Sequence, residues 1–199
     1  MKAASSDMKA ASWPPGTHYV DEANLAIAFF TGVTRGGDAP LMYEKRAQSW
    51  QGRSWNEVAN SVRRLASVLV DAGVSAGDRV MISAENRPEW AIADLAIMAI
   101  GAIVVPAYVT NTEDDHYFIM DHSGASAVIT SGGLLGARIA LAASRAPGLH
   151  LMILMDDDAT VPPMKSVKTR YWNEALGAAE PLADLDRRIA RQKPDDVCC

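Results

Sequence analysis

The fold is decided by one stretch of the chain, residues 77–108, which reads GDRVMISAENRPEWAIADLAIMAIGAIVVPAY. Its first part, residues 79–84, is a short apolar run typical of a buried strand. A proline and a glutamate then mark a helix start, because both are favoured in the first helical turn. The helix predicted over residues 88–100 is apolar nearly all round, which indicates burial on several sides. A second buried strand over residues 102–108 completes a β-α-β unit.

The same alternation continues downstream of this unit. Thr112 and the acidic residues after it predict a helix to about His122, followed by further elements in the order strand, helix, strand: residues 127–131, 134–146 and 150–155. Short connections between alternating strands and helices favour a parallel sheet with right-handed crossovers. We therefore predict an α/β fold, a mostly parallel layered sheet with helices on both faces.

Upstream, the sequence predicts a helix that begins at a capping box. The hydroxyl of Ser54 can accept from the amide of Glu57, while that carboxylate reaches back to the amide of Ser54. Apolar residues then recur on one helical face until Gly73 supplies a left-handed stop: Val58, Val62, Leu65 and Leu69. Before this helix we expect a short helix over residues 25–30 and a hairpin from residues 40–47 and 50–53.

The ends of the chain differ in texture from its middle. Residues 1–15 are predicted to be a disordered tail, since they lack the apolar core of a signal peptide. After Asp156 we expect an irregular excursion, then helices over residues 172–176 and 182–191. Residues 194–199 look like the beginning of a strand.

Composition excludes several classes of function. Apolar residues make up 49% of the chain and charged residues 22%, as in an ordinary globular protein. The net charge of −5, without a Lys/Arg cluster, argues against nucleic-acid binding. The longest uncharged stretch, residues 95–109, is shorter than the roughly 20 residues that cross a bilayer. Two adjacent cysteines, Cys198 and Cys199, offer neither a loop-closing disulfide nor metal-ligand spacing, which favours a cytoplasmic setting.

Four groups of residues invite a functional interpretation, and none is decisive. The turn at residues 131–136 follows a strand and opens a helix, but its spacing matches no phosphate-binding motif, so we interpret it as a plain turn. The carboxylates of residues 156–158 cannot all converge on one ion, so a solvated loop is expected there.

The third group lies on the helix that begins at Thr112, and the fourth lies just before that helix. His116 and His122 accompany Asp114, Asp115 and Asp121, but six residues of helix set the two rings about 120° apart. We expect exposed polar groups there and not a metal site. Tyr108 and Thr110 sit at the carboxyl end of a strand, where open α/β sheets bind ligands, although Tyr108 could equally be a packed aromatic.

A family resemblance adds what these patterns lack. Residues 77–90 resemble the GDRV…NRPEW signature of the adenylate-forming superfamily, and residues 93–108 resemble its ADLAILKAGAVVVPLY helix and strand. The segments 110–112 and 121–125 resemble wording frequent in long-chain acyl-CoA synthetases. The match covers residues 50–131 best.

The resemblance implies an AMP-forming acyl-CoA synthetase. A fatty carboxylate would react with magnesium-bound ATP to give an acyl-adenylate and diphosphate, and the thiol of coenzyme A would displace AMP. Residues 16–199 would be the amino-terminal part of the AMP-binding domain, ending before its phosphate loop, so no catalytic, cofactor-binding or metal residue is assigned here and the chain alone is expected to be inactive. The whole enzyme would make transient peripheral membrane contact.

Three alternatives remain open at this point. The first is another adenylate-forming enzyme, activating an aryl or amino acid, because the scaffold signature does not read the acyl pocket. The second is a non-catalytic α/β binding module, if residue 199 is the natural end. The third, a nucleotide-binding regulatory domain, rests only on the turn at Gly132 and Gly133.

Overall fold

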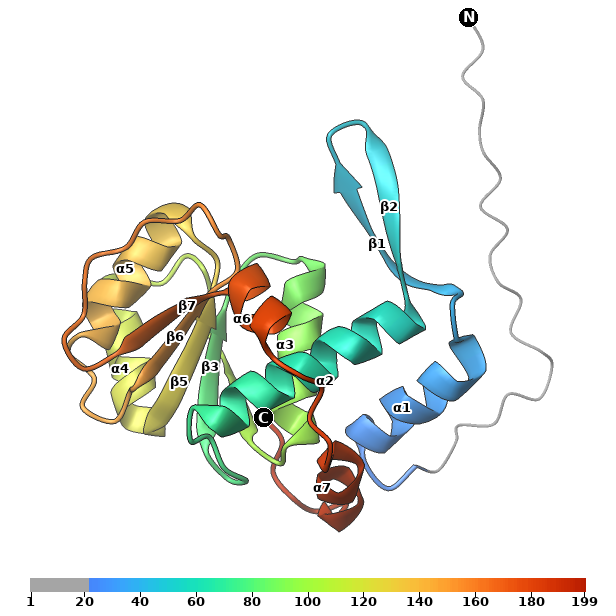
Figure 1. Ribbon diagram of the computed structural model, residues 1–199. Coiled ribbons are helices and arrows are strands. Elements are labelled where there is room, and N and C mark those ends of the chain that lie inside the picture. The colour runs from blue at the N-terminus through green and yellow to red at the C-terminus, as the bar shows by residue number, and fades with distance from the viewer. Residues whose placement is uncertain (1–21) are drawn as a thin grey trace, which may run out of the picture.

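The computed structural model describes residues 22–199, so the predicted tail at residues 1–15 lies outside the described part (Figure 1). Its centre is a five-stranded sheet in the order β4-β3-β5-β6-β7. All neighbouring strands of this sheet are parallel. The strands are β3 (Arg79–Ser83), β4 (Ile103–Pro106), β5 (Ala125–Thr130), β6 (Leu151–Leu154) and β7 (Lys168–Tyr171). The predicted α/β class and parallel sheet are confirmed.

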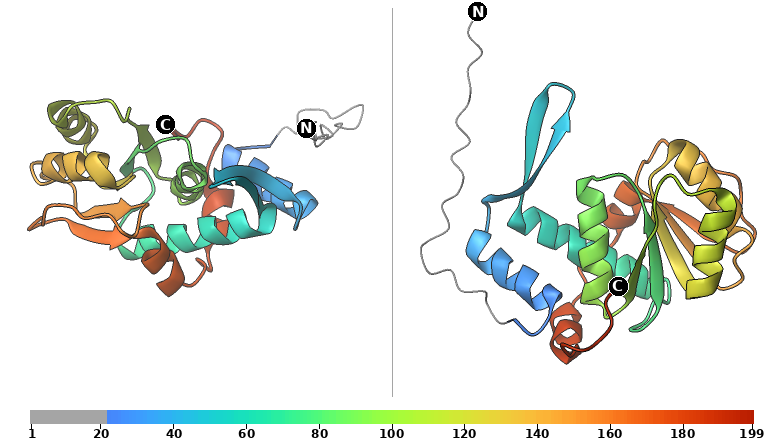
Figure 2. Two further views of the ribbon diagram at one scale, coloured as in Figure 1. Left: turned by 90° about the horizontal axis from the view of Figure 1, so that it is seen from above. Right: turned by 180° about the vertical axis from the view of Figure 1, so that it is seen from behind.

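Helices cover both faces of this sheet, as the sequence predicts (Figures 1 and 2). On one face Val80 and Ile82 belong to a core shared with α2 (Trp55–Asp71), α3 (Pro88–Ala99) and α6 (Trp172–Ala178). On the other face Met81 and Val128 belong to a second core beneath α4 (Glu113–Ser123) and α5 (Gly133–Ala143). This division follows from the strand period of two, which sends alternate side chains to opposite faces.

Capping boxes place the starts of α2 and α4 where the sequence predicts them. The capping box of α2 is present, with Glu57 N donating to Ser54 Oγ and Ser54 N donating to the Glu57 carboxylate. Thr112 and Asp115 form the same arrangement at α4. The predicted apolar face of α2 is fully buried, and Gly73 has a φ of 95° after the helix ends.

The remaining elements are peripheral to the sheet. α1 (Leu25–Gly36) packs on α2, and α7 (Leu185–Arg191) packs near α1 and α3. The hairpin of β1 (Pro40–Arg46) and β2 (Ser49–Ser54) projects away from the body of the molecule (Figure 1). Its side chains Tyr43 and Trp50 are 56% and 69% exposed.

Two sequence predictions about the end of the chain are wrong. The excursion after Asp156 contains a strand, β7, whose short polar sequence KTRY suits the exposed edge of a sheet and gives no apolar signal. Residues 194–199 form no strand, although the carbonyl of Cys198 accepts a hydrogen bond from Val104 N on the edge strand β4. Among residues 22–199, no helix has the length and apolar character that crossing a bilayer requires.

Candidate functional site

The order of the parallel strands identifies one edge of the sheet as the place for a ligand. Counted from β3, the order is 2-1-3-4-5, in which the chain first moves outward to β4 and then crosses back to β5. In such sheets ligands bind outside the carboxyl ends of the two strands where the direction reverses. Here those strands are β3 and β5, so the loops beginning at Ala84 and Ser131 form the candidate site.

The loops after β3 and β5 are joined directly across this switch point. The hydroxyl of Ser131 donates to the carboxylate of Glu85. At the strand ends beneath them, Ser83 and Thr130 are register partners and both are fully buried. Within residues 22–199 the hydroxyl of Ser83 has no hydrogen-bond partner. The switch point is therefore polar both in its loops and in the layer below them.

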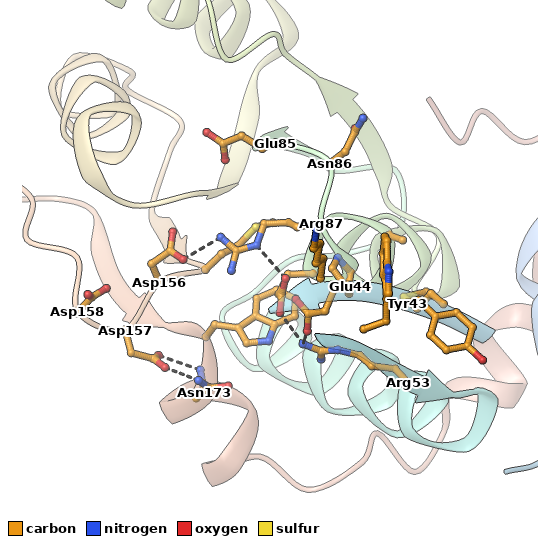
Figure 3. A pocket seen from close by; sticks show the side chains of 18 residues that line it. Tyr43, Glu44, Arg53, Glu85, Asn86, Arg87, Asp156, Asp157, Asp158 and Asn173 are labelled. Carbon is orange, nitrogen blue, oxygen red and sulfur yellow. Dashed lines mark hydrogen bonds and ion pairs between the residues drawn. The ribbon is translucent and has the colours of Figure 1, made fainter. Parts of the chain in front are cut away.

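A chain of ion pairs runs along one side of the switch point (Figure 3). Arg53 of β2 and Arg87 before α3 each bond one oxygen of the Glu89 carboxylate at 2.8 Å. Arg87 also reaches Asp156 after β6 at 2.8 Å, and the other oxygen of Asp156 accepts from Gly132 N at 2.7 Å. The side chain of Glu89 is only 5% exposed. These ion pairs and the hydrogen bond from Gly132 link the hairpin, α3, the end of β6 and the start of α5.

The ionisation of Asp156 reflects these contacts. Burial opposes its negative charge most strongly, but the amide of Gly132 and the guanidinium of Arg87 together hold the pKa of the Asp156 carboxyl below its ordinary value. Asp156 is therefore ionised at neutral pH.

A large cavity opens beside this chain of charges. It has a volume of about 1180 Å³ and lies between the hairpin, the loop after β3, residues 155–158 and the start of α6 (Figure 3). Asp157 turns away from Arg87 and accepts from Asn173 at the start of α6. A smaller cavity of about 470 Å³ shares Glu85 and Asn86 with it and extends towards Trp90 and Tyr108.

The glycine turn after β5 does not fit an ATP phosphate. The amide of Gly132 at the start of α5 already donates to Asp156, so a phosphate there would meet a carboxylate. A Cβ at Gly132 would lie 2.5 Å from Cβ of Ala159, so its glycine is explained by packing. Among residues 22–199 no three His, Cys, Asp or Glu side chains gather as a metal site.

The structure corrects three expectations about candidate residues. His116 is fully buried and not exposed, whereas His122 is exposed and stacks on Phe118. Residues 157 and 158 are exposed, as expected of a solvated loop, whereas Asp156 is half-buried in its ion pair with Arg87. Tyr108 is 81% exposed, so its interpretation as a packed aromatic is wrong.

Sequence reasoning missed the residues that organise the site. Arg53, Arg87 and Glu89 come from three different structural contexts, and only Glu89 carried a local signal, as a helix-start residue. Arg87 and Glu89 are two positions apart, but the pairs Arg53–Glu89 and Arg87–Asp156 span 36 and 69 positions, so no spacing rule connects them. Thr110 lies exposed in the loop between β4 and α4, beside Tyr108.

Fold and site together describe an α/β sheet of doubly wound order with its candidate site at the carboxyl edge. Residues 29–199 match the family model described as AMP-binding enzyme. The chain therefore belongs to the AMP-binding enzyme family, as the resemblance in its sequence predicts.

Two of the curated relatives are long-chain-fatty-acid–CoA ligases. The chain is 42% identical over 76 residues to the long-chain-fatty-acid–CoA ligase FadD15 of Mycobacterium tuberculosis, a match covering 38% of this chain and 13% of that protein. It is 33% identical over 190 residues to the long-chain-fatty-acid–CoA ligase 6 of Rattus norvegicus, covering 91% of this chain and 27% of that protein. The chain thus spans about a quarter or less of these relatives.

Solved structures share the fold. A benzoate CoA ligase from Burkholderia xenovorans LB400 superposes with a TM-score of 0.66 at 24% identity, covering 80% of this chain and 29% of that one. The A domain of a carboxylic acid reductase from Segniliparus rugosus, solved with AMP and a carboxylic acid, gives a TM-score of 0.71 at 15% identity, covering 83% and 32%. At these identities the likeness shows the fold alone.

Proposed function

We propose that this chain is the amino-terminal part of the adenylate-forming domain of a long-chain fatty acid–CoA ligase. The observation that carries the proposal is the 33% identity to a long-chain-fatty-acid–CoA ligase over 91% of the chain. The activity proposed for the whole protein converts a fatty acid, ATP and coenzyme A into acyl-CoA, AMP and diphosphate, with Mg²⁺ accompanying ATP.

The role that the geometry supports for this part of the protein is structural. The ion pairs of Arg53, Glu89, Arg87 and Asp156 fix the hairpin and the loops of the carboxyl edge relative to one another. Because the amide of Gly132 already donates to Asp156, it is not free to bind a phosphate at this edge. We propose that ATP and coenzyme A bind mainly to other parts of the protein and that residues 1–199 alone do not catalyse.

The setting of the enzyme is part of the same proposal. ATP and coenzyme A are consumed inside cells, and the two thiols at residues 198 and 199 are free, so we propose a cytoplasmic location. A fatty-acid substrate would bring the whole protein into transient contact with a membrane surface.

One alternative substrate class has a specific observation in its favour. The second candidate is an aromatic acid, because the scaffold signature over residues 77–108 does not read the acyl pocket. The cavity near Trp90 and Tyr108 is apolar over most of its wall, and its volume of about 470 Å³ would admit a ring as well as a segment of acyl chain.

The proposal is tested by assaying the protein encoded by the complete reading frame that contains this chain. Palmitate, benzoate and a mixture of amino acids are supplied in turn with ATP, Mg²⁺ and coenzyme A, and AMP and thioester products are measured. Palmitate-dependent AMP and palmitoyl-CoA support the proposal. Preference for benzoate or for an amino acid assigns the protein to another adenylate-forming activity, and no product with any acid favours the binding module.

A further inference from the structure

His116 occupies an unusual position on α4. It has no exposed surface, and within residues 22–199 neither ring nitrogen has a hydrogen-bond partner. One helical turn later, Met120 lies on the same side of α4 and is buried with Met81 and Val128 of the sheet. The imidazole of His116 therefore points into the apolar layer that α4 shares with α5 and the sheet.

An apolar residue would fill this position at lower cost. A neutral imidazole carries one donor and one acceptor, and leaving a buried polar group unsatisfied costs about 1–3 kcal/mol. What a histidine adds at such a place is a charge that appears only in acid. Packing by itself therefore gives no reason for a titratable ring between α4 and β5.

The charged groups around His116 make its protonation unfavourable. Burial has the largest effect and the guanidinium of Arg138 on α5 the next, and together they lower the pKa of His116 against a weaker opposing effect of Asp115. β5, the strand that α4 contacts, carries no ionisable side chain. Arg145, just after α5, is paired with Glu113 and Asp114 at the exposed side of α4.

Arg138 also holds the loop that leads into α4. Its Nη1 donates to the carbonyls of Asn111 at 2.8 Å and Val109 at 3.4 Å. This loop carries Tyr108, which lines the smaller cavity at the carboxyl edge. The guanidinium that opposes a positive charge on His116 is therefore the same group that holds this loop.

We propose that His116 is an acid-sensitive switch. The neutral ring allows α4 to pack on the sheet, and protonation detaches α4 together with the loop that Arg138 holds. The inference does not depend on the acid that the whole enzyme activates. In acid the loop bearing Tyr108 loses its fixed position, so the smaller cavity changes shape.

The direction of the pH effect follows from linkage. The pKa of His116 is lower in the folded chain than the ordinary value of about 6.5 that it regains when α4 opens. Opening therefore takes up a proton below about pH 6.5, and each further pH unit favours opening by up to about tenfold until the folded pKa is reached. Above that range the closed state keeps its full stability.

The test is hydrogen exchange followed by mass spectrometry on the full chain, from about pH 7.5 to about pH 5, a range that spans the ordinary pKa of histidine. Exchange of residues 113–123 is corrected for the intrinsic pH dependence and compared with α2 in the same sample. The wild type is compared with His116→Leu and with His116→Gln, which keeps a polar group without the charge. His122→Gln and His150→Gln are controls, because His122 is exposed and His150 has its own buried nitrogen without a partner in the described chain.

The expected result is a loss of protection in α4, but not in α2, by up to about tenfold per pH unit below about pH 6.5 in the wild type and both controls. The same loss should be absent from His116→Leu and His116→Gln. The proposal would be overturned if the two His116 variants lost protection in acid as steeply as the wild type. It would also be overturned if the wild type showed no loss in α4, or a loss that α2 shares to the same extent. If His116→Leu does not fold, His116→Gln decides alone.

Discussion

Nη1 of Arg87 lies 2.8 Å from Oδ1 of Asp156, which joins the loop after β3 to the loop after β6 across 69 positions of sequence. The second oxygen of the same carboxylate accepts from the amide of Gly132 at the start of α5. Asp156 therefore occupies the positive end of a helix that would otherwise be open to an anion. This contact gives the carboxyl edge its shape and closes its most obvious phosphate site.

Replacing Asp156 by asparagine should lower the free energy of unfolding by about 2 kcal/mol, because hydrogen bonds to a charged group are lost or weakened. The difference between wild type and Asp156→Asn is measured by urea unfolding as a function of pH. Because the folded pKa of Asp156 is depressed, the difference should be constant above about pH 4 and vanish as the pH falls through the folded pKa. A difference that persists unchanged in stronger acid would show that the charge of Asp156 is not what stabilises the loop.

The buried carboxylate of Glu89 should be the most sensitive member of the ion-pair chain. Its replacement by glutamine leaves Arg53 and Arg87 without their shared anion, and breaking a buried pair in this way costs about 3 kcal/mol. Tryptophan fluorescence during urea unfolding measures the effect. Asp186→Asn is the matched control, because Asp186 is 74% exposed in its pair with Arg63 and should change stability by less than about 1 kcal/mol. Equal effects of the two substitutions would contradict the account.

Gly132→Ala should also destabilise the chain, because its new Cβ would lie 2.5 Å from Cβ of Ala159 and 3.1 Å from Cβ of Asp156. Overpacking of this kind costs about 1–3 kcal/mol. Gly177→Ala provides a contrast, since a Cβ there meets nothing within 4 Å, and alanine is favoured over glycine in a helix by about 1 kcal/mol. Thermal unfolding should thus shift in opposite directions for the two variants, and a stabilised Gly132→Ala would show that the loop is looser than described.

The scaffold could be predicted from sequence because its signals are local. The capping box at Ser54 and Glu57 is readable within one helical turn. The apolar face of α2 and the run of β-α-β units are readable from the periodicity of neighbouring residues. β7 was not predicted, because a four-residue polar edge strand is recognised only by its pairing with β6. An edge strand of this kind needs no apolar pattern.

The site could not be predicted in the same way. Arg87 pairs with Glu89 within the start of α3, but only the folded sheet brings Asp156 to Arg87. His116 escaped for a related reason: its neighbours Asp114 and Asp115 make this part of the sequence look solvated, whereas the helix turns His116 inward. Sequence could therefore place the carboxyl edge in general terms but not the charges that organise it.

The most direct test of the central claim, that residues 1–199 form a scaffold and not an ATP site, is equilibrium dialysis of the chain against ATP and Mg²⁺. Circular dichroism first establishes that the chain is folded, and the protein from the complete reading frame serves as the positive control. We expect no saturable binding to the 199-residue chain up to about 1 mM ATP, which is the upper end of ordinary enzyme KM values. The complete protein should bind ATP saturably. Binding of one ATP per 199-residue chain within that range would contradict the scaffold role. It would favour a nucleotide site at the turn of Gly132 and Gly133.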